Sequence, residues 1–292
     1  MGLICMTSSS RFPFYIVSHN RADNCLTADC LDNYDAEFFI VIESEDYEAY
    51  SEHWDEDVLL TVPQEYKEQY ETYDSLGFEK PKGPGPARNF AWEHSIEQGY
   101  DWHWVMDDNI IRFYFYTDNK MFTFTDESAF RAMEDFTLQY KNIAMAGPHY
   151  FMFVARKDLN QPMNLNTRVY SCNLIRNDTG YRWAGRYNED TDLSLRMLKD
   201  DWCTVQFRVF LQDKETTQRI DGGNTENFYK HEGTYPKSRM LKRCHPDVTE
   251  IKKKYDRWHH RVDYSVFKDN KLIKHENPDV TFGDYDFSFS NI

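Results

Sequence analysis

The sequence lacks a long apolar run and a recognisable targeting signal. No stretch of its 292 residues approaches the about 20 consecutive apolar residues that a transmembrane helix requires. The segment Met1–Met6 has neither the cationic region nor the apolar length of a secretory signal, and it lacks the Ser or Thr of an N-myristoylation motif. We therefore expect a soluble cytoplasmic protein that has no membrane partner.

Paired cysteines are also absent. The six cysteines are scattered and form no Cys-x-x-Cys pair, so we expect free thiols and no structural zinc site. Hydrophobic residues make up 40% of the chain and aromatic residues 16%, which excludes a disordered protein. The length is enough for one large domain or two small ones with a substantial core.

Cations are in deficit, because 34 Lys and Arg stand against 49 Asp and Glu, a net charge of −15. This balance argues against a nucleic-acid partner, since binding to phosphates requires a basic surface. The deficit is uneven, however. Residues 230–274 contain nine Lys and four Arg against six acids, or +7, which leaves −22 on the rest. This segment either faces a polyanion or forms a solvated helical surface.

Three short apolar runs in the first quarter of the chain predict strands: Phe14–Val17, Phe38–Ile42 and Val58–Val62. Continuously apolar strands separated by helical segments are typical of a parallel sheet covered on both faces. We therefore expect an α/β fold with a Rossmann-like, mostly parallel central sheet flanked by helices. Ligands bind beyond the carboxyl ends of such strands. The polar residues that directly follow the first two runs, among them Ser18, His19, Arg21 and Glu43, are therefore candidate ligand-binding residues.

A loop with two Gly and two Pro, Lys82–Asn89, precedes a predicted helix over about Ala87–Gln98 that ends at Gly99. Arg88 and Asn89 then lie at a helix N-terminus, where backbone N–H groups favour an anion. The alternative is an ordinary capped helix.

The apolar run Trp102–Met106 predicts a buried strand that leads into Asp107, Asp108 and Asn109. Adjacent carboxylates repel each other unless water or a cation separates them. Hard oxygen ligands suit Mg²⁺ or Mn²⁺, which bind through one or two carboxylates and substrate phosphates. Asp-Asp pairs also occur in ordinary turns, so the pair alone does not identify a metal site.

Later segments predict further elements. Thr125 is a candidate N-cap for a helix, and strands are expected near Asn142–Met145 and Phe151–Ala155. A second helix opens near Glu189 and Asp190, whose carboxylates either complement the helix dipole or enter a cleft. Further along the chain, Asp221–Thr225 is a turn that could wrap a phosphate. Two later segments, Lys252–Tyr255 and Arg257–Arg261, mix cations with aromatic residues.

The order of these motifs resembles the inverting GT-A glycosyltransferases of the family-two type. A narrower likeness, carried by Leu165–Ser171, Gly185–Arg196 and Gly222–Thr225, is to the TET-associated glycosyltransferases of bacteriophages. That family is similar in role to the phage enzymes that glycosylate 5-hydroxymethylcytosine in DNA, which implies the cytoplasm of an infected bacterium. The chain departs from many relatives at Asn109, where they have Asp.

The resemblance implies a UDP-sugar donor and a Mn²⁺ or Mg²⁺ cofactor. The uracil and ribose would lie across Val17, Ser18, His19, Arg21 and Glu43. Arg88 would contact the diphosphate or the base, and Asp107 the ribose. Asp108, with Asn109, would hold the metal ion that bridges the phosphates.

The resemblance also implies a general base, Asp190, preceded by Glu189 in the same motif. The expected acceptor is 5-hydroxymethylcytosine in DNA, contacted by Trp183, Arg186 and Tyr187. Core packing is the alternative for Trp183 and for Trp258. The sugar, whether glucose, N-acetylglucosamine or a pentose, stays open, as does the oligomeric state.

Other functions are compatible with some of these residues. A glycosyltransferase acting on a polysaccharide, lipid or protein would share the nucleotide-binding half. A metal-dependent phosphodiesterase or nuclease would use Asp107, Asp108, Glu189 and Asp190, and a third alternative is a non-catalytic binding module. We expect a catalytic domain over 1–228, with a nucleotide-sugar half (1–109) and an acceptor half (110–228). A basic C-terminal extension, 229–292, would pack on it.

Overall fold

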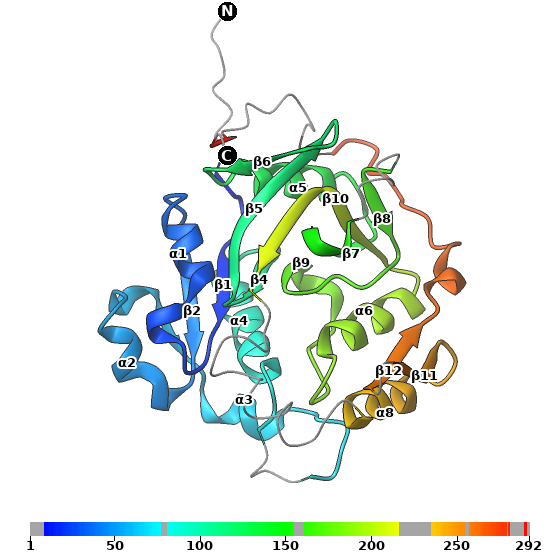
Figure 1. The fold of residues 1–292 in the computed structure, drawn as a ribbon, viewed down its shortest axis with the longest axis horizontal. Coiled ribbons are helices and arrows are strands. Elements are labelled where there is room, and N and C mark those ends of the chain that lie inside the picture. Colours follow the sequence, from blue (N-terminus) through cyan, green and yellow to red (C-terminus); the bar gives the residue numbers. More distant parts are fainter. Residues whose placement is uncertain are drawn as a thin grey trace, which may run out of the picture.

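The computed structural model describes residues 9–76, 81–154, 161–215, 235–254, 257–278, 280 and 289–290. Figure 1 shows the fold. The helices are α1 Leu26–Asp32, α2 Tyr47–Ser51, α3 Gln64–Gln69, α4 Gly85–Glu97, α5 Ser128–Thr137, α6 Glu189–Lys199 and α8 Tyr235–Cys244. The strands are β1 Phe14–Val17, β2 Phe38–Ile42, β3 Leu59–Thr61, β4 Trp102–Asp107, β5 Ile110–Thr117, β6 Lys120–Phe124, β7 Ile143–Tyr150, β8 Met163–Leu165, β9 Cys172–Arg176, β10 Cys203–Lys214, β11 Thr249–Lys254, β12 Arg257–Val262 and β13 Phe289–Ser290.

One large sheet forms the centre of the described chain, in the order β13-β6-β5-β10-β7-β9-β4-β1-β2-β3, with β8 paired to β10. Strands β3, β2, β1 and β4 pair in parallel, and so do β7 and β10. Strand β9 runs antiparallel between β4 and β7. The α/β class and the mostly parallel core of the sheet that the sequence predicts are therefore confirmed.

The central strands are apolar throughout because helices cover both faces of the sheet. Phe14 and Ile16 of β1 pack in one cluster with residues of α1 and α5. Tyr15, which points to the opposite face, packs with Ala87 and Ala91 of α4. Since successive strand residues alternate between faces, a strand buried on both sides must be apolar throughout.

This topology gathers the functional motifs at one edge. Val17 at the end of β1 lies in register with Val41 of β2 and Asp107 of β4. The carboxyl ends of these parallel strands therefore meet at the same edge of the sheet.

Three local predictions are wrong or incomplete. Helix α5 begins at Ser128, not after Thr125, because Asp126 accepts a hydrogen bond from the Ser128 backbone N–H at 3.0 Å. Strand β7 continues to Tyr150, and the next apolar residues, Phe151–Phe153, form a 3₁₀ turn. In the described part of the basic segment 230–274, the structure has helix α8 and the antiparallel strands β11 and β12. The alternative of a solvated helical surface is therefore only partly correct. The turn Asp221–Thr225 lies outside the described residues.

Among the helices in the described ranges, none has the length and apolarity needed to cross a lipid bilayer.

Candidate active site

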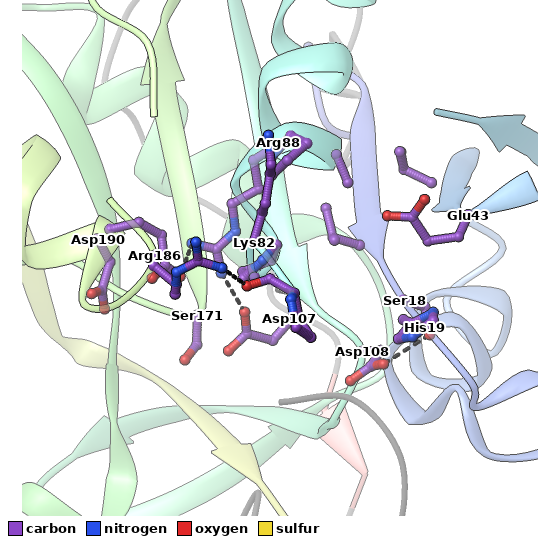
Figure 2. Close-up of a pocket in the computed structure, with 18 of the residues that line it drawn as sticks. Ser18, His19, Glu43, Lys82, Arg88, Asp107, Asp108, Ser171, Arg186 and Asp190 are labelled. Atoms are coloured by element: carbon purple, nitrogen blue, oxygen red, sulfur yellow. Dashed lines mark hydrogen bonds and ion pairs between the residues drawn. The ribbon is translucent and has the colours of Figure 1, made fainter. Parts of the chain in front are cut away.

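A cavity of about 640 Å³ opens at the carboxyl edge of the sheet (Figure 2). It brings together nearly all the residues singled out from the sequence: Val17, Ser18, His19, Arg21, Glu43, Arg88, Asp107, Asp108, Asn109, Arg186, Tyr187, Glu189 and Asp190. Its lining contains eight Lys and Arg against six Asp and Glu, although the whole chain has a net charge of −15. Local cations in an acidic protein favour an anionic ligand.

Asp108 is held at the β1 side of the cavity and is 5% exposed. Arg21 forms an ion pair with one of its oxygens, and Ser18 Oγ donates a hydrogen bond to the other at 2.8 Å. Burial raises the pKa of Asp108, and the charge of Arg21 only partly opposes this effect. The carboxylate is thus fixed in place by its neighbours.

Arg88 connects the two sides of the cavity. Its guanidinium, 4% exposed, lies 2.6 Å from Asp107 Oδ1 on β4 and 3.0 Å from Glu189 Oε1 on α6. The Trp183 ring supports the guanidinium from a centroid distance of 4.6 Å. Burial disfavours the charge on Asp107, but Lys214 and Arg88 outweigh it and lower the pKa of Asp107.

Asp190 and Glu189 enter the cavity from the first turn of α6. In Figure 2, Asp190 lies on the opposite side of the view from Asp108, with Asp107 between them. The Thr191 backbone N–H donates to Asp190 Oδ1 at 2.7 Å and orients that carboxylate. Burial raises the pKa of Glu189, while the charge of Arg88 opposes the shift. A carboxylate on each side of a cation-rich cavity suits proton transfer beside an anionic leaving group.

The sequence profile of the TET-Associated Glycosyltransferase family matches residues 12–223. The chain belongs to the TET-associated glycosyltransferase family. It is therefore an enzyme that transfers sugar, and the mixed α/β sheet is consistent with a GT-A-like fold. No curated protein matches the sequence.

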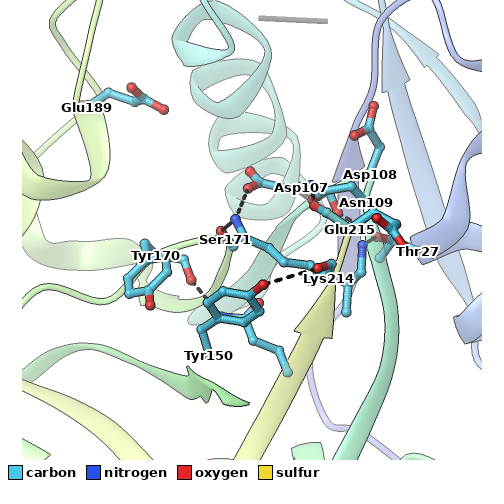
Figure 3. Close-up of polar contacts among 12 residues, drawn as sticks. Thr27, Asp107, Asp108, Asn109, Tyr150, Tyr170, Ser171, Glu189, Lys214 and Glu215 are labelled. Atoms are coloured by element: carbon cyan, nitrogen blue, oxygen red, sulfur yellow. Dashed lines mark hydrogen bonds and ion pairs between the residues drawn. The ribbon is translucent and has the colours of Figure 1, made fainter. Parts of the chain in front are cut away.

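Sequence reasoning missed several cavity residues of this glycosyltransferase, among them Lys214 at the end of β10. Its Nζ donates to Ser171 Oγ at 2.5 Å and lies 3.6 Å from Asp107 Oδ2 (Figure 3). The signal used for β1 and β4 is weak here, because Gln206, Arg208 and Gln212 interrupt the apolar residues of β10. The ammonium group adds a point charge at the centre of the site.

The three predicted acceptor residues of the glycosyltransferase differ in position. Trp183 is 1% exposed and lies in the core beneath Arg88, so core packing is the interpretation that fits, and base stacking does not. Arg186, 2% exposed, lines the cavity but is held by Asp74 at 2.7 Å. Tyr187 is half-buried and lines the cavity.

The side-chain oxygens of Asp108 and Asn109 fit a divalent cation that takes most of its ligands from a substrate. Asn109 Oδ1 is buried and has no hydrogen-bond partner among the residues that the structure describes, although its amide donates to the Glu215 carbonyl at 2.7 Å. Within the same ranges there is no cluster of three or more His, Cys, Asp or Glu side chains suited to a metal. Mg²⁺ commonly uses one or two carboxylates plus phosphates. Such an ion would compete with Arg21 for Asp108.

Proposed function

We propose that this glycosyltransferase moves a sugar from a UDP-sugar to the hydroxyl of 5-hydroxymethylcytosine in DNA, with inversion at the anomeric carbon. The observation that carries the proposal is that Asp190 and the Asp107–Arg88 pair line one cavity whose cations outnumber its acids. A base and a set of cations for a diphosphate therefore lie within reach of one bound substrate.

The uridine would occupy the ends of β1 and β2. His19 is positioned there by Asp46, whose carboxylate lies 2.7 Å from its Nδ1, and this hydrogen bond raises the pKa of His19. Glu43 forms an ion pair with Lys67 at the end of β2. These polar side chains can bind the ribose and base, while the apolar ends of the strands pack against the ring.

The diphosphate would lie near Arg88 and Lys214. Both cations are already oriented, Arg88 by two carboxylates and Trp183, and Lys214 by Ser171. Preorganised charges stabilise a leaving group without reorganising during the reaction. The charge that develops on the departing UDP is thereby offset by side chains of this chain.

Asp190 would act as the general base. As the acceptor oxygen attacks the anomeric carbon, its proton passes to the Asp190 carboxylate and the bond from that carbon to the UDP oxygen breaks. A single displacement from the opposite face inverts the anomeric centre. Base catalysis of this kind contributes about 10²–10⁴-fold, which is the loss expected for Asp190→Asn.

Asp108 and the Asn109 carbonyl would hold a Mn²⁺ or Mg²⁺ ion, which when bound supplies further positive charge to the diphosphate. Mn²⁺ titration followed by electron paramagnetic resonance, with and without UDP, tests this point. Asn109→Ala should weaken Mn²⁺ binding in the presence of UDP, and unchanged binding would rule out Asn109 as a ligand.

The acceptor assignment is supported by the family to which the chain belongs. The hydroxymethyl group of the modified cytosine lies in the major groove, so either the cavity approaches the groove or the nucleotide is flipped out. Flipping costs a few kcal/mol.

A donor and acceptor panel tests the function. UDP-sugars are incubated with DNA containing 5-hydroxymethylcytosine, with ordinary DNA and without acceptor, and nucleosides are analysed by mass spectrometry. We expect a mass gain of one sugar on the modified cytosine only. UDP release without any nucleoside mass gain would instead favour a polysaccharide, lipid or protein acceptor, and no UDP release from any donor would reject the donor assignment.

A further inference from the structure

Positive charge is concentrated in α8, β11 and β12. These three elements contain nine Lys and Arg and a single acid, Glu250, a net +8 in a chain of −15. The matched family region ends at residue 223, before α8 begins. The concentration of charge is therefore a feature that the family match does not account for.

The hairpin register places most of its charge on one face. The directly opposed pairs Glu250↔Arg261, Lys252↔His259 and Lys254↔Arg257 alternate with the pairs of the other face. Directly opposed residues share a face, and successive residues alternate. The outer face therefore consists of Glu250, Lys252, Lys254, Arg257, His259 and Arg261, which are all exposed.

The Thr249–Val262 end of the inner face packs on the enzyme, whereas the pair Lys253 and Trp258 at its other end is exposed. Thr249 is buried, and Val262 packs against Leu195 and Leu198 of α6 together with Leu241 of α8. This packing fixes the orientation of the hairpin, so its cationic face points away from the core. The single acid of that face, Glu250, lies 2.7 Å from Lys252 in an exposed pair, and such pairs contribute little.

The same elements adjoin the Asp190 side of the cavity. Lys237 of α8 lines the cavity, and the Asn188 side chain donates to its carbonyl at 2.9 Å. His260, on the inner face of β12, lies near Lys237, Arg168 and Asp190. Burial lowers the pKa of His260. The charges of Lys237 and Arg168 lower it further, whereas the charge of Asp190 raises it. Figure 1 shows α8 and the hairpin beside α6, whose first turn carries Asp190.

We infer that α8 and the outer face of the β11–β12 hairpin form a docking surface for the phosphate backbone of duplex DNA. DNA presents about one negative charge per 1.7 Å of helix axis, which a row of exposed cations neutralises with release of counterions. The outer face itself carries no apolar side chain to insert into an anionic membrane. Beside it, Tyr235 of α8 and Trp258 of β12 are exposed and contact each other, so vesicle binding is an outcome that the test must distinguish from DNA binding. The inference rests on the proposed function, and it adds how the acceptor is held beside Asp190.

Binding to unmodified duplex DNA tests the surface without requiring sugar transfer. Fluorescence anisotropy is measured from about 50 to 200 mM salt for the wild type and for Arg257→Gln/Arg261→Gln. The matched control is Lys120→Gln/Lys141→Gln, which removes two exposed cations from elsewhere on the chain. A third variant, Lys252→Gln, removes one cation of the outer face.

The expected effect follows from counterion release, which contributes about 0.9 to the slope of log K against log[salt] per phosphate contact. In Arg257→Gln/Arg261→Gln the magnitude of this slope should fall by about 1.8. The affinity of the wild type relative to that of the variant should therefore decrease about 12-fold between 50 and 200 mM salt. Lys252→Gln should lower the slope by about 0.9. The control should retain the slope of the wild type.

Equal losses in the hairpin variant and the control, or an unchanged slope in the hairpin variants, would overturn the inference. So would binding to phosphatidylserine vesicles that depends on Arg257 and Arg261 while binding to DNA does not. Transfer to the free nucleoside 5-hydroxymethyl-2′-deoxycytidine should be equal in wild type and variants. A wild type that transfers sugar to no acceptor refutes the proposed function, whereas the slopes still decide the docking surface.

Discussion

Replacing Arg88 by methionine removes the cation that joins β4 to α6 and retains most of the apolar bulk of the side chain. In the wild type this guanidinium pairs with Asp107 at 2.6 Å and Glu189 at 3.0 Å, and it lies over the Trp183 ring. The substitution leaves two carboxylates in a largely buried setting without their shared partner.

The magnitude follows from the burial of the pairs. Removing one partner of a buried ion pair costs about 3–5 kcal/mol. Asp107 is 29% exposed and keeps Lys214 at 3.6 Å, so we expect the lower end, a loss of about 3 kcal/mol in the free energy of unfolding. In the proposed function the missing cation also preorganises the site for the diphosphate, so kcat should fall about 10²–10³-fold.

The loss should depend on pH in a defined direction. Burial raises the pKa of Glu189, and Arg88 opposes this shift, so the variant raises that pKa further. A carboxyl group whose folded-state pKa is raised contributes stability at low pH that is lost as the pH rises through that pKa. The stability difference between wild type and variant should therefore be smaller at pH 5 than at pH 8.

Urea unfolding measures the free energy, and UDP release measures kcat. The matched control is Arg182→Met. Arg182 pairs with Glu93 at 2.7 Å and lies 5.1 Å from the Trp92 ring centroid, but both charged side chains are 38% exposed. The control should lose no more than about 1 kcal/mol. A loss below about 1 kcal/mol in Arg88→Met, or equal losses in the two variants, would refute the reasoning.

Three further predictions concern single residues. Lys214→Met removes the ammonium beside Asp107, so kcat in a UDP-release assay should fall about 100-fold; an unchanged kcat would exclude a role in leaving-group stabilisation. Burial raises the pKa of Glu134 from 4.5 to about 7, so its contribution to stability is present below pH 4.5 and lost as the pH rises through 7. Relative to wild type, Glu134→Gln should therefore gain about 3 kcal/mol in urea unfolding between pH 4 and 8, and parallel pH curves would contradict the shift. Gly85→Ala would place a Cβ atom against Tyr70 Oη, too close for the present packing. The free energy of unfolding should therefore be about 1–3 kcal/mol lower than in wild type. A melting temperature equal to that of the wild type would contradict this close contact.

The convergence of polar residues at the ends of β1, β2 and β4 could be predicted because its signals are local. An apolar run predicts a buried strand, and the first polar residues after it must lie at the edge of the sheet. Parallel pairing then aligns these ends, as Val17 opposite Asp107 shows. The same rule does not identify Lys214, because β10 is interrupted by Gln206, Arg208 and Gln212 and contains Lys214 as its own last residue.

The contacts of Arg88 could not be predicted, because they join positions far apart in the chain. Glu189 is 101 residues from Arg88 in sequence, and only the tertiary fold brings them together. Trp183 illustrates the same limit: an aromatic residue beside a predicted acceptor site fits stacking on a base, yet its ring packs under Arg88. Orientation of a side chain depends on its partner, which local sequence does not reveal.

The distribution of charge connects the cavity with the surface formed by α8 and the β11–β12 hairpin. A chain of −15 repels a polyanion over most of its surface, so productive contact requires cations gathered where the substrate must lie. In the described chain they gather in the cavity lining, which contains Asp190, and on α8 with the β11–β12 hairpin, which adjoins that lining through Lys237. An acidic remainder then opposes DNA bound in other orientations, because like charges approach at a cost. Net charge alone argued against a nucleic-acid partner, whereas its placement favours an enzyme that admits a polyanion at one face.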